Sequence, residues 1–263
     1  IYYVKNATNQ TFDSNLGSVG AFYCINCSGV AFKNLSIQSN TEAGLYLYKT
    51  SNSTIESVAS WGSGTGIRLK YSDGNTIKKN STVNNGTGIY VGGNSNTIIG
   101  NGTDSNTTGI SVDGTYNKVA SNNALSNYSD GITLSGAYNE VSGNTSNNNG
   151  SNGIKLLEAE HSSITSNSTQ DNSSVGIYLG SSSNNLVTGN QVTANGANAW
   201  NGNYAGLFLF SSNDNNVTSN TVSNNQRFGV YLYQSDGNDV HSNQFLNNYI
   251  QAYVVQSNRN IFN

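Results

Sequence analysis

The side chains best suited to acid and base chemistry in this chain are Glu160 and His161, together with Asp214 and Asp236 further along the sequence. All four stand seven or eight residues after a glycine, at a recurring place in the sequence. Such groups can transfer protons or bind calcium where several of them converge on one point. The other acidic residues, among 14 in total, are dispersed. Whether these four converge depends on the elements that carry them.

A second group is the Cys24-x-x-Cys27 pair, which contains the only two cysteines of the chain. A thioredoxin-type redox pair needs its first thiolate at a helix N-terminus within a βαβ unit, and this stretch reads as β-structure. Zinc would need two further ligands, but the two histidines, His161 and His241, belong to much later parts of the chain. We expect a local disulfide or two part-buried thiols, with an intermolecular disulfide as the alternative. We assign no metal and no cofactor.

Aromatic residues form a third group, because they alternate with aliphatic residues and period two places them on one face of a strand. The outward position between two core aliphatics carries Tyr46, Tyr90, Tyr178, Phe208, Tyr231 and Tyr253. We expect the later ones to form a continuous outward patch. It could shield the sheet by cross-strand stacking, form a lateral protein interface or bind sugar rings. The candidate interface or sugar-binding residues are Tyr178, Trp200, Tyr204, Phe208, Phe210, Tyr231 and Tyr233.

These groups are carried by a repeat of about 22 residues that begins with a glycine and an aliphatic residue. The repeat glycines are Gly44, Gly66, Gly88, Gly109, Gly131, Gly153, Gly176, Gly206 and Gly229. Apolar and polar residues alternate between them, which leaves no helical period. One coil cannot bury its aliphatic residues alone, so successive coils must stack. The sequence predicts an all-β parallel β-helix of about ten to eleven coils. It forms a single domain, 1–263, with irregular first coils (1–43), regular repeats (44–250) and a final partial coil (251–263).

Asparagine recurs at fixed places in the coils and predicts ladders along the rod. At a tight bend it tolerates left-handed backbone angles, and its amide can bond the equivalent amide above and below. One expected ladder comprises Asn80, Asn101, Asn122, Asn144, Asn167, Asn190, Asn220 and Asn243. A second column comprises Asn75, Asn96, Asn117, Asn139, Asn185 and Asn238. Sequons in the polar turn before the next glycine are candidate N-glycosylation sites, namely Asn85, Asn106, Asn127, Asn149 and Asn172.

The stretch Gly176-Ile-Tyr-Leu-Gly-Ser-Ser-Ser-Asn-Asn-Leu-Val-Thr-Gly-Asn190 resembles the NosD-type parallel β-helix repeat. The resemblance covers nearly the whole chain and extends to archaeal, especially methanogen, cell-surface and sheath proteins. It implies a right-handed solenoid. It implies no single activity, because members include carbohydrate-active enzymes, metal-centre maturation factors and structural wall components. Function therefore has to be inferred from the site.

The composition and the two ends of the chain indicate which classes of partner the protein can have. The net charge is -3 and the 11 basic residues are scattered, which argues against nucleic-acid binding. No apolar run is long enough to span a membrane. The chain begins at Ile1 without an initiator methionine, so we expect a mature or trimmed form. Neither end shows a polar cap. Either the ends are truncated or other copies complete them by head-to-tail stacking.

We expect an extracellular, cell-surface structural protein that self-assembles with copies of itself into a layer, sheath or filament. The alternative is a polysaccharide-binding or adhesive module whose aromatic residues bind cell-surface glycans. A polysaccharide lyase or hydrolase is less favoured, because strand spacing puts Asp214 and Asp236 roughly 10 Å or more from Glu160.

Overall fold

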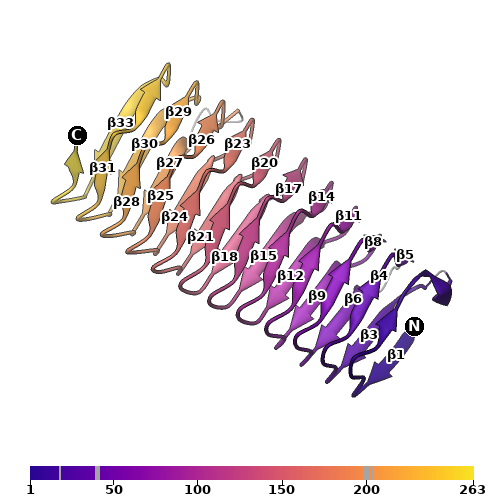
Figure 1. Ribbon diagram of the computed structural model, residues 1–263. Helices are drawn as coiled ribbons and strands as arrows, with labels where there is room; N and C mark the ends of the chain where they lie inside the picture. The colour runs from indigo at the N-terminus through magenta and orange to yellow at the C-terminus, as the bar shows by residue number, and fades with distance from the viewer. Residues whose placement is uncertain (18, 39–41, 198–201, 203) are drawn as a thin grey trace.

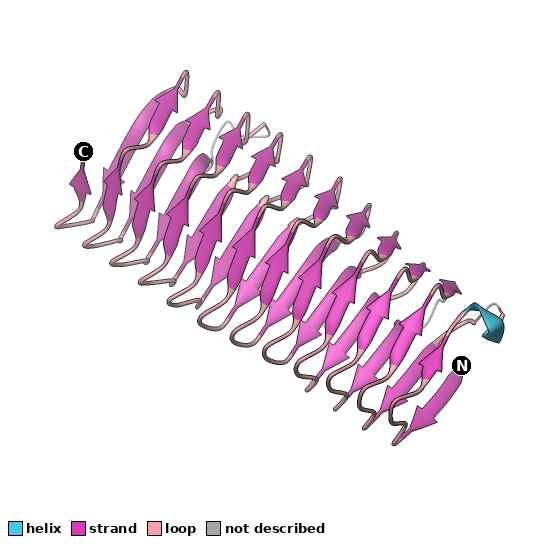
Figure 2. Ribbon diagram, in the orientation of Figure 1, coloured by secondary structure: helices cyan, strands magenta, loops and turns pink. Residues whose placement is uncertain are grey.

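The computed structural model describes residues 1–17, 19–38, 42–197, 202 and 204–263. In Figure 1 the chain winds into a rod of stacked coils, with its two termini at opposite ends. The described strands form three parallel sheets of 12, 12 and 10 members. Figure 2 shows strands joined by short turns along the whole rod, with one short 3-10 helix, η1 (Ser14–Leu16), near the N-terminus. Among the described residues, no helix is long and apolar enough to cross a membrane.

Each regular coil contributes one strand to each sheet in the same order. The first sheet contains β1 (Tyr2–Lys5), β3 (Phe22–Ile25), β6 (Ala43–Tyr48), β9 (Thr65–Lys70), β12 (Thr87–Gly92), β15 (Thr108–Asp113), β18 (Ile132–Ser135), β21 (Ile154–Leu157), β24 (Ile177–Gly180), β27 (Ala205–Phe210), β30 (Phe228–Tyr233) and β33 (Ile250–Val255). The second contains β2 (Thr11–Phe12), β4 (Ala31–Lys33), β7 (Thr54–Glu56), β10 (Thr76–Lys78), β13 (Thr97–Ile99), β16 (Lys118–Ala120), β19 (Glu140–Ser142), β22 (Ser163–Thr165), β25 (Leu186–Thr188), β28 (Asn216–Thr218), β31 (Asp239–His241) and β34 (Ile261–Phe262). The third contains β5 (Ser36–Gln38), β8 (Ala59–Trp61), β11 (Ser81–Val83), β14 (Gly102–Asp104), β17 (Asn123–Leu125), β20 (Thr145–Asn147), β23 (Ser168–Gln170), β26 (Gln191–Thr193), β29 (Thr221–Ser223) and β32 (Gln244–Leu246). The first, second and third bends follow the first, second and third sheets.

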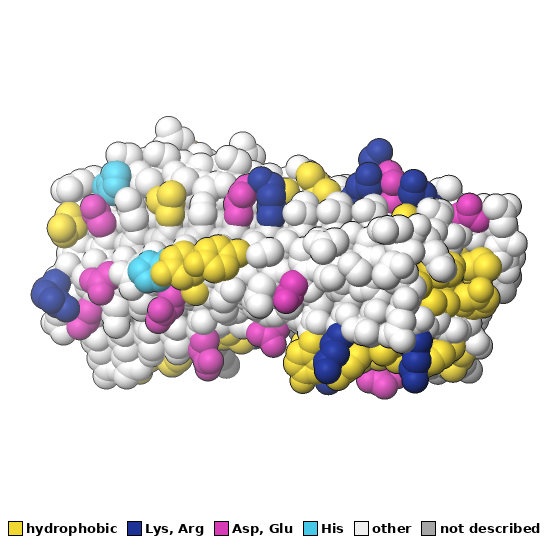
Figure 3. All heavy atoms as spheres, turned by 60° about the horizontal axis from the view of Figure 1, so that its bottom comes forward, with side chains coloured by type: hydrophobic (Ala, Val, Ile, Leu, Met, Phe, Trp, Pro, Cys, Tyr) yellow, Lys and Arg dark blue, Asp and Glu magenta, His cyan; other side chains and the backbone are white. Residues whose placement is uncertain are grey.

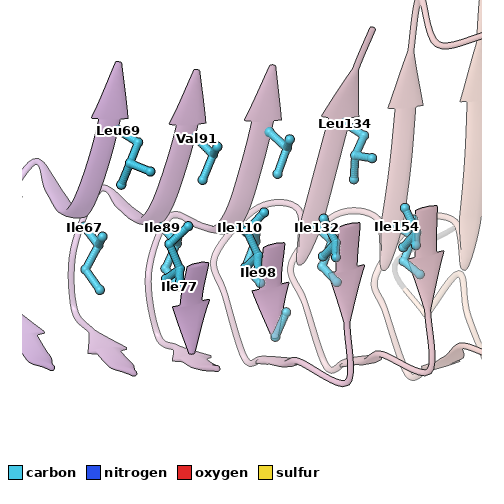
Figure 4. Packing of buried hydrophobic residues seen from close by; sticks show 14 of the residues in the cluster. Ile67, Leu69, Ile77, Ile89, Val91, Ile98, Ile110, Ile132, Leu134 and Ile154 are labelled. Atoms are coloured by element: carbon cyan, nitrogen blue, oxygen red, sulfur yellow. The ribbon is translucent and has the colours of Figure 1, made fainter. Parts of the chain in front are cut away.

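Aliphatic side chains fill the narrow interior in columns that run from coil to coil (Figure 4). Parallel pairing aligns Ile67, Ile89 and Ile110 residue by residue in the first sheet. The second sheet contributes Ile77 and Ile98, and all five side chains are fully buried. Burial of each stabilises the fold by roughly 1.5–3 kcal/mol. The predicted all-β parallel β-helix with its 22-residue repeat is confirmed.

The repeat glycine is required by close backbone approach at the start of each first-sheet strand. A Cβ built on Gly88 would lie 2.6 Å from the carbonyl oxygen of Gly109 in the next coil and 2.5 Å from Oγ1 of Thr82. Any other residue would push the coils apart at this corner. The number of residues between successive repeat glycines is therefore the number of residues in one coil.

The predicted asparagine ladder is confirmed and lies at the second bend. Nδ2 of Asn101 donates to Oδ1 of Asn122 at 2.9 Å and to the carbonyl oxygen of Ile77 at 2.9 Å. Its own Oδ1 accepts from the backbone N–H and from Nδ2 of Asn80, at 3.0 and 2.9 Å. The second column forms the same ladder at the first bend, where Ser162 replaces asparagine in one coil. These bonds satisfy polar groups that the stacked coils hide from water.

Left-handed backbone falls one residue before the ladder asparagines, which corrects the expected role of asparagine at the bend. Lys79 has φ 55° and Ser121 has φ 53°, whereas Asn80 and Asn122 do not have positive φ. Asparagine is selected here for its amide, which bonds in both directions along the rod. The backbone turn itself is made by the preceding residue.

The five candidate glycosylation sites form a third ladder at the third bend, and the expectation that they are accessible is wrong. Asn85, Asn106, Asn127, Asn149 and Asn172 are each at most 4% exposed. As an example, Nδ2 of Asn106 donates to Oδ1 of Asn127 at 3.3 Å. A glycan on Nδ2 would remove such bonds and would have to occupy the space filled by the neighbouring coil.

Cys24 and Cys27 form an intramolecular disulfide, with their Cα atoms 6.1 Å apart. Cys24 belongs to β3 and Cys27 to the bend after it, and both are buried, at 0% and 2% exposure. The structure therefore selects the local disulfide among the alternatives that the sequence leaves open.

Candidate functional site

The predicted aromatic residues lie on the outer face of the first sheet, but they do not all form an exposed patch. Phe208 and Tyr231 stack face to face with ring centroids 4.7 Å apart, and they are only 6% and 5% exposed. Val175, Ala205 and Phe228, which the sequence did not single out, complete this outer cluster. Phe208 and Tyr231 therefore shield the sheet, as in the first of the three interpretations, and are not available as a bare platform.

Tyr178, Phe210 and Tyr233 are half-buried and pack against this cluster. Tyr204 is also half-buried. Trp200 lies outside the described residues. The accessible part of the predicted set is thus smaller than the sequence suggested, and Tyr178 and Tyr204 line a common hollow described below.

The acid and base candidates do not converge. Glu160 is exposed, and the ring of His161 stacks on Tyr138 at 5.1 Å, which in turn stacks on Tyr116 at 5.1 Å. In Figure 3 this stack is the row of hydrophobic side chains that ends at a histidine. Asp236 accepts a hydrogen bond from the backbone N–H of Asn258 at 2.6 Å in a later coil. Among the described residues, the acid and base candidates belong to no group of three or more side chains that could hold a metal ion.

Two in-register columns of outward side chains run along the first sheet. Strand pairing aligns the first column residue by residue as Tyr3, Tyr23, Tyr46, Arg68, Tyr90, Ser111, Thr133, Lys155, Tyr178, Phe208, Tyr231 and Tyr253. The second column runs two residues further on in each strand as Lys5, Ile25, Tyr48, Lys70, Gly92, Asp113, Ser135, Leu157, Gly180, Phe210, Tyr233 and Val255. Figure 3 shows Lys and Arg side chains set among hydrophobic ones near the N-terminal end of the rod.

A first hollow of about 410 Å³ opens on this face beside Gly92. Lys70 and Asp113 are the in-register neighbours of Gly92 on either side, so the missing side chain leaves space between a cation and a carboxylate. The Tyr90 ring leans over the glycine, and its hydroxyl lies 2.9 Å from the place a Cβ at position 92 would take. Asp73, from the preceding coil, adds a second carboxylate to the lining.

A second hollow of about 380 Å³ opens four strands further along the same sheet. It lies near the start of the strands, beside Ser174 and Val175, whereas the first hollow lies near their end, beside Gly93 and Asn94. Its lining includes Lys155, Tyr178, Tyr204 and Asn152. The Tyr178 ring leans over Gly180 in the way that Tyr90 leans over Gly92, with its hydroxyl 2.9 Å from the place that a Cβ at position 180 would take. Each hollow is thus lined by a tyrosine and by a lysine from the preceding strand, and Gly180 itself is not part of the second lining.

Two cations on this face, Lys155 and Arg68, are paired with carboxylates. Lys155 forms an ion pair with Asp130 at 3.4 Å, and Asp130 is buried, at 7% exposure, where it also accepts from Asn152. Arg68 forms an ion pair with Glu42 and lies over the rings of Tyr46 and Tyr90, at 5.4 and 5.8 Å from their centroids. The guanidinium therefore links two aromatic side chains into one surface.

Tyr90 and Tyr178 have raised pKa values. Burial raises the pKa of Tyr90 above its usual 10.0, and the negative charge of Asp113 raises it further. Burial alone raises the pKa of Tyr178. Both phenols therefore carry an O–H that can donate at neutral pH. With carboxylates, an amide and lysines nearby, the two hollows offer aromatic faces together with hydrogen-bond donors and acceptors.

Several solved structures share this fold, among them an epimerase module, a phage tailspike and a glucanase domain. The A-module of a mannuronan C-5 epimerase from Azotobacter vinelandii has a TM-score of 0.73 at 13% identity, covering 99% of this chain and 90% of its own. The receptor-binding tailspike of bacteriophage Det7 has a TM-score of 0.69 at 13% identity, and the match covers 90% of this chain and 51% of the tailspike chain. The catalytic domain of an α-1,3-glucanase in complex with nigerose has a TM-score of 0.66 at 13% identity, and the match covers 99% of this chain and 57% of the glucanase chain. At such identities the likeness shows the fold alone. No curated protein matches the sequence significantly.

Two family profiles match the sequence. The right handed beta helix region matches residues 19–103 and 87–200, and the periplasmic copper-binding protein (NosD) family matches residues 196–263. Copper in proteins is bound by imidazole, thiolate or thioether groups. The NosD-matched segment has one histidine, His241, and no cysteine or methionine. Within the part of the chain that the structure describes, no three His, Cys, Asp or Glu side chains group to hold a metal. These residues do not fit a copper centre. The chain belongs to the right-handed β-helix family and is a NosD-type β-helix repeat protein, as the resemblance of its repeat predicted.

Proposed function

We propose that this protein is an exported polysaccharide-binding protein that holds an extended glycan along the outer face of its first sheet. The observation that carries the proposal is the placement of two tyrosine-walled hollows on one straight face, four strands apart. The strands between them present small hydroxyl side chains, Ser111, Thr133 and Ser135. A linear chain could follow this strip from one hollow to the other.

The residue types suit a sugar polymer. Ligand sites combine apolar and aromatic walls with a few polar groups that fix orientation. Tyr90 and Tyr178 supply the aromatic walls, while Asp113, Asn152 and the serine and threonine hydroxyls can bond to sugar hydroxyl groups. Two fold neighbours support the same ligand class, since by name they act on mannuronan and on α-1,3-glucan.

An exported location is part of the proposal. The disulfide between Cys24 and Cys27 suits an oxidising compartment such as the periplasm or the exterior. The NosD family, which matches residues 196–263, is described as periplasmic. Both observations favour a periplasmic or secreted protein.

The test is affinity electrophoresis in gels that contain α-1,3-glucan, β-1,4-glucan or mannuronan. We expect at least one polysaccharide to retard the protein and a Tyr90→Ala/Tyr178→Ala variant to migrate as in an empty gel. The control is Tyr249→Ala, because Tyr249 is 82% exposed and lines neither hollow. Unchanged migration of the wild type in all three gels would refute the proposal. Analysis of the polysaccharide for cleavage or epimerisation after incubation would show whether binding is accompanied by catalysis.

A second candidate is the structural subunit of a cell-surface layer, sheath or filament formed from copies of this chain. The observation that favours it is the pair of partly buried aromatic side chains beside the outer cluster, Phe210 and Tyr233. Lateral packing of a second copy on this face would cover them. Electron microscopy of the native protein tests this candidate: filaments or sheets support it, and dispersed single rods at high concentration count against it.

A further inference from the structure

We infer that the bound glycan is uncharged and long enough to occupy both hollows at once, an inference that rests on the proposed function. The first step is the charge of the two hollows. In the first, Lys70 faces two carboxylates, Asp73 and Asp113. In the second, Lys155 is paired with the buried Asp130. Neither hollow has an excess of positive charge.

An acidic polysaccharide would therefore meet no lysine without a carboxylate in either hollow, and Arg227 beside the second hollow is already engaged by the Gly202 carbonyl oxygen at 2.6 Å and by the Phe228 ring. At the first hollow its carboxylates would approach Asp73 and Asp113, and like charges brought together at a binding site oppose association. Arg68, a further cation on this face, is already engaged by Glu42 and by two aromatic rings. Neutral sugars avoid this repulsion, and their hydroxyl groups can bond to the same carboxylates. The charge distribution thus favours a neutral glycan.

The second step is geometry. Tyr90 on β12 and Tyr178 on β24 stand in the same outward column, separated by four strand-to-strand steps. At about 4.8 Å per step the two rings are about 19 Å apart along the rod. A glycan shorter than this can fill one hollow only. A longer one crosses Ser111 and Thr133, whose small side chains leave the strip between the hollows open.

The third step is the energetic consequence of two linked sites. Once one hollow is filled, the second binding event becomes intramolecular, which raises the apparent affinity by about 10²-fold or more when the ligand spans both sites. Affinity should therefore rise steeply at the length that reaches both hollows. A bulky residue placed on the strip should remove this step without affecting short ligands.

The experiment is isothermal titration of size-fractionated oligosaccharides of α-1,3-glucan, β-1,4-glucan and mannuronan. The variants are Thr133→Tyr, which blocks the strip, and Gly92→Ala, whose Cβ would push the Tyr90 ring out of its place over the first hollow. Gly92 does not have a positive φ, so alanine is compatible with its backbone. The controls are Thr145→Tyr on the third sheet and Gly102→Ala, where an added Cβ meets only open space and a carbonyl oxygen at 4.0 Å. Circular dichroism confirms that each variant is folded.

We expect a neutral glucan series to show an affinity step of about 10²-fold at the spanning length. Thr133→Tyr and Gly92→Ala should lose the step, and both controls should keep it. Tighter binding of mannuronan, weakened by salt, would overturn the neutral class and leave the proposed function standing. A length series without a step, or a step that survives in Thr133→Tyr, would overturn the spanning mode. Failure of every series to bind would refute the proposed function itself.

Discussion

The asparagine ladder at the second bend offers the sharpest test of what holds the coils together, and Asn122→Ala is the perturbation. Oδ1 of Asn122 accepts from the backbone N–H and from Nδ2 of Asn101, both at 2.9 Å. Its Nδ2 donates to the carbonyl oxygen of Ile98 at 2.9 Å and to Oδ1 of Asn144 at 3.0 Å. Alanine removes all four bonds in the middle of the rod.

The expected cost follows from the groups left behind. The backbone N–H of Asn101 and one of its amide protons lose their acceptor in a buried bend, and each unsatisfied buried group costs about 1–3 kcal/mol. We expect Asn122→Ala to lower the free energy of unfolding by roughly 4 kcal/mol, which is large for one substitution. The neighbouring Asn123→Ala is the matched control, because Asn123 is exposed in β17. Its effect should stay within about 0.5 kcal/mol.

Differential scanning calorimetry at one scan rate measures both variants. A loss of roughly 4 kcal/mol corresponds to a thermal midpoint lowered by about 8–16 °C in a chain of this size. If the two variants unfold within 1–2 °C of each other, the ladder bonds do not carry the stability assigned to them. A ladder that only aligns the coils would give that result.

Four further predictions concern the remaining features. Replacing both Cys24 and Cys27 with alanine should cost about 2 kcal/mol, because the disulfide closes a short loop, and covalent dimers on a non-reducing gel of the wild type would contradict the intramolecular pairing. Phe208→Ala should cost about 3–5 kcal/mol as a core truncation, measured by urea unfolding; a fully stable variant with weakened glycan binding would instead make Phe208 a ligand residue. Burial raises the pKa of Tyr231 above 10.0. The stability that its neutral phenol contributes is therefore present below pH 10 and declines as the pH rises toward the folded-state pKa. Melting curves of Tyr231→Phe over this pH range should show a smaller decline than those of the wild type. Mass spectrometry of protein secreted from a glycosylating host should find Asn106 unmodified, and a glycan there would contradict its burial.

Much of the fold could be predicted because the repeat is local. The spacing of glycines such as Gly88 reports a close backbone approach, and alternation places Ile89 inside and Tyr90 outside. The ladder position of Asn101 could likewise be located from its distance to the preceding aliphatic residue. Each of these inferences needs only one coil and the assumption that the next coil repeats it.

The candidate site could be predicted only in part. Tyr178 was recognised as outward, but Gly92, Asp113 and Lys155 carry no signal within their own coils. Their importance comes from register, because Gly92 matters only where Lys70 and Asp113 are its neighbours on adjacent strands. Writing the coils one above another in the register of the strands would have brought Lys70, Gly92 and Asp113 together and located the first hollow.

The sequence by itself determined the parallel β-helix, the inward and outward faces of its strands and two of its three asparagine ladders, because all of these follow from periods along the chain. The tertiary structure alone decided which outward side chains remain accessible. Phe208 and Tyr231 have the same alternating pattern as Tyr90, yet Phe228 and Val175 pack around them and remove them from solvent. It also placed Asn106 in a buried bend rather than an exposed turn. The physical reason is that burial depends on the size and position of side chains in neighbouring coils, which a period along one chain does not specify.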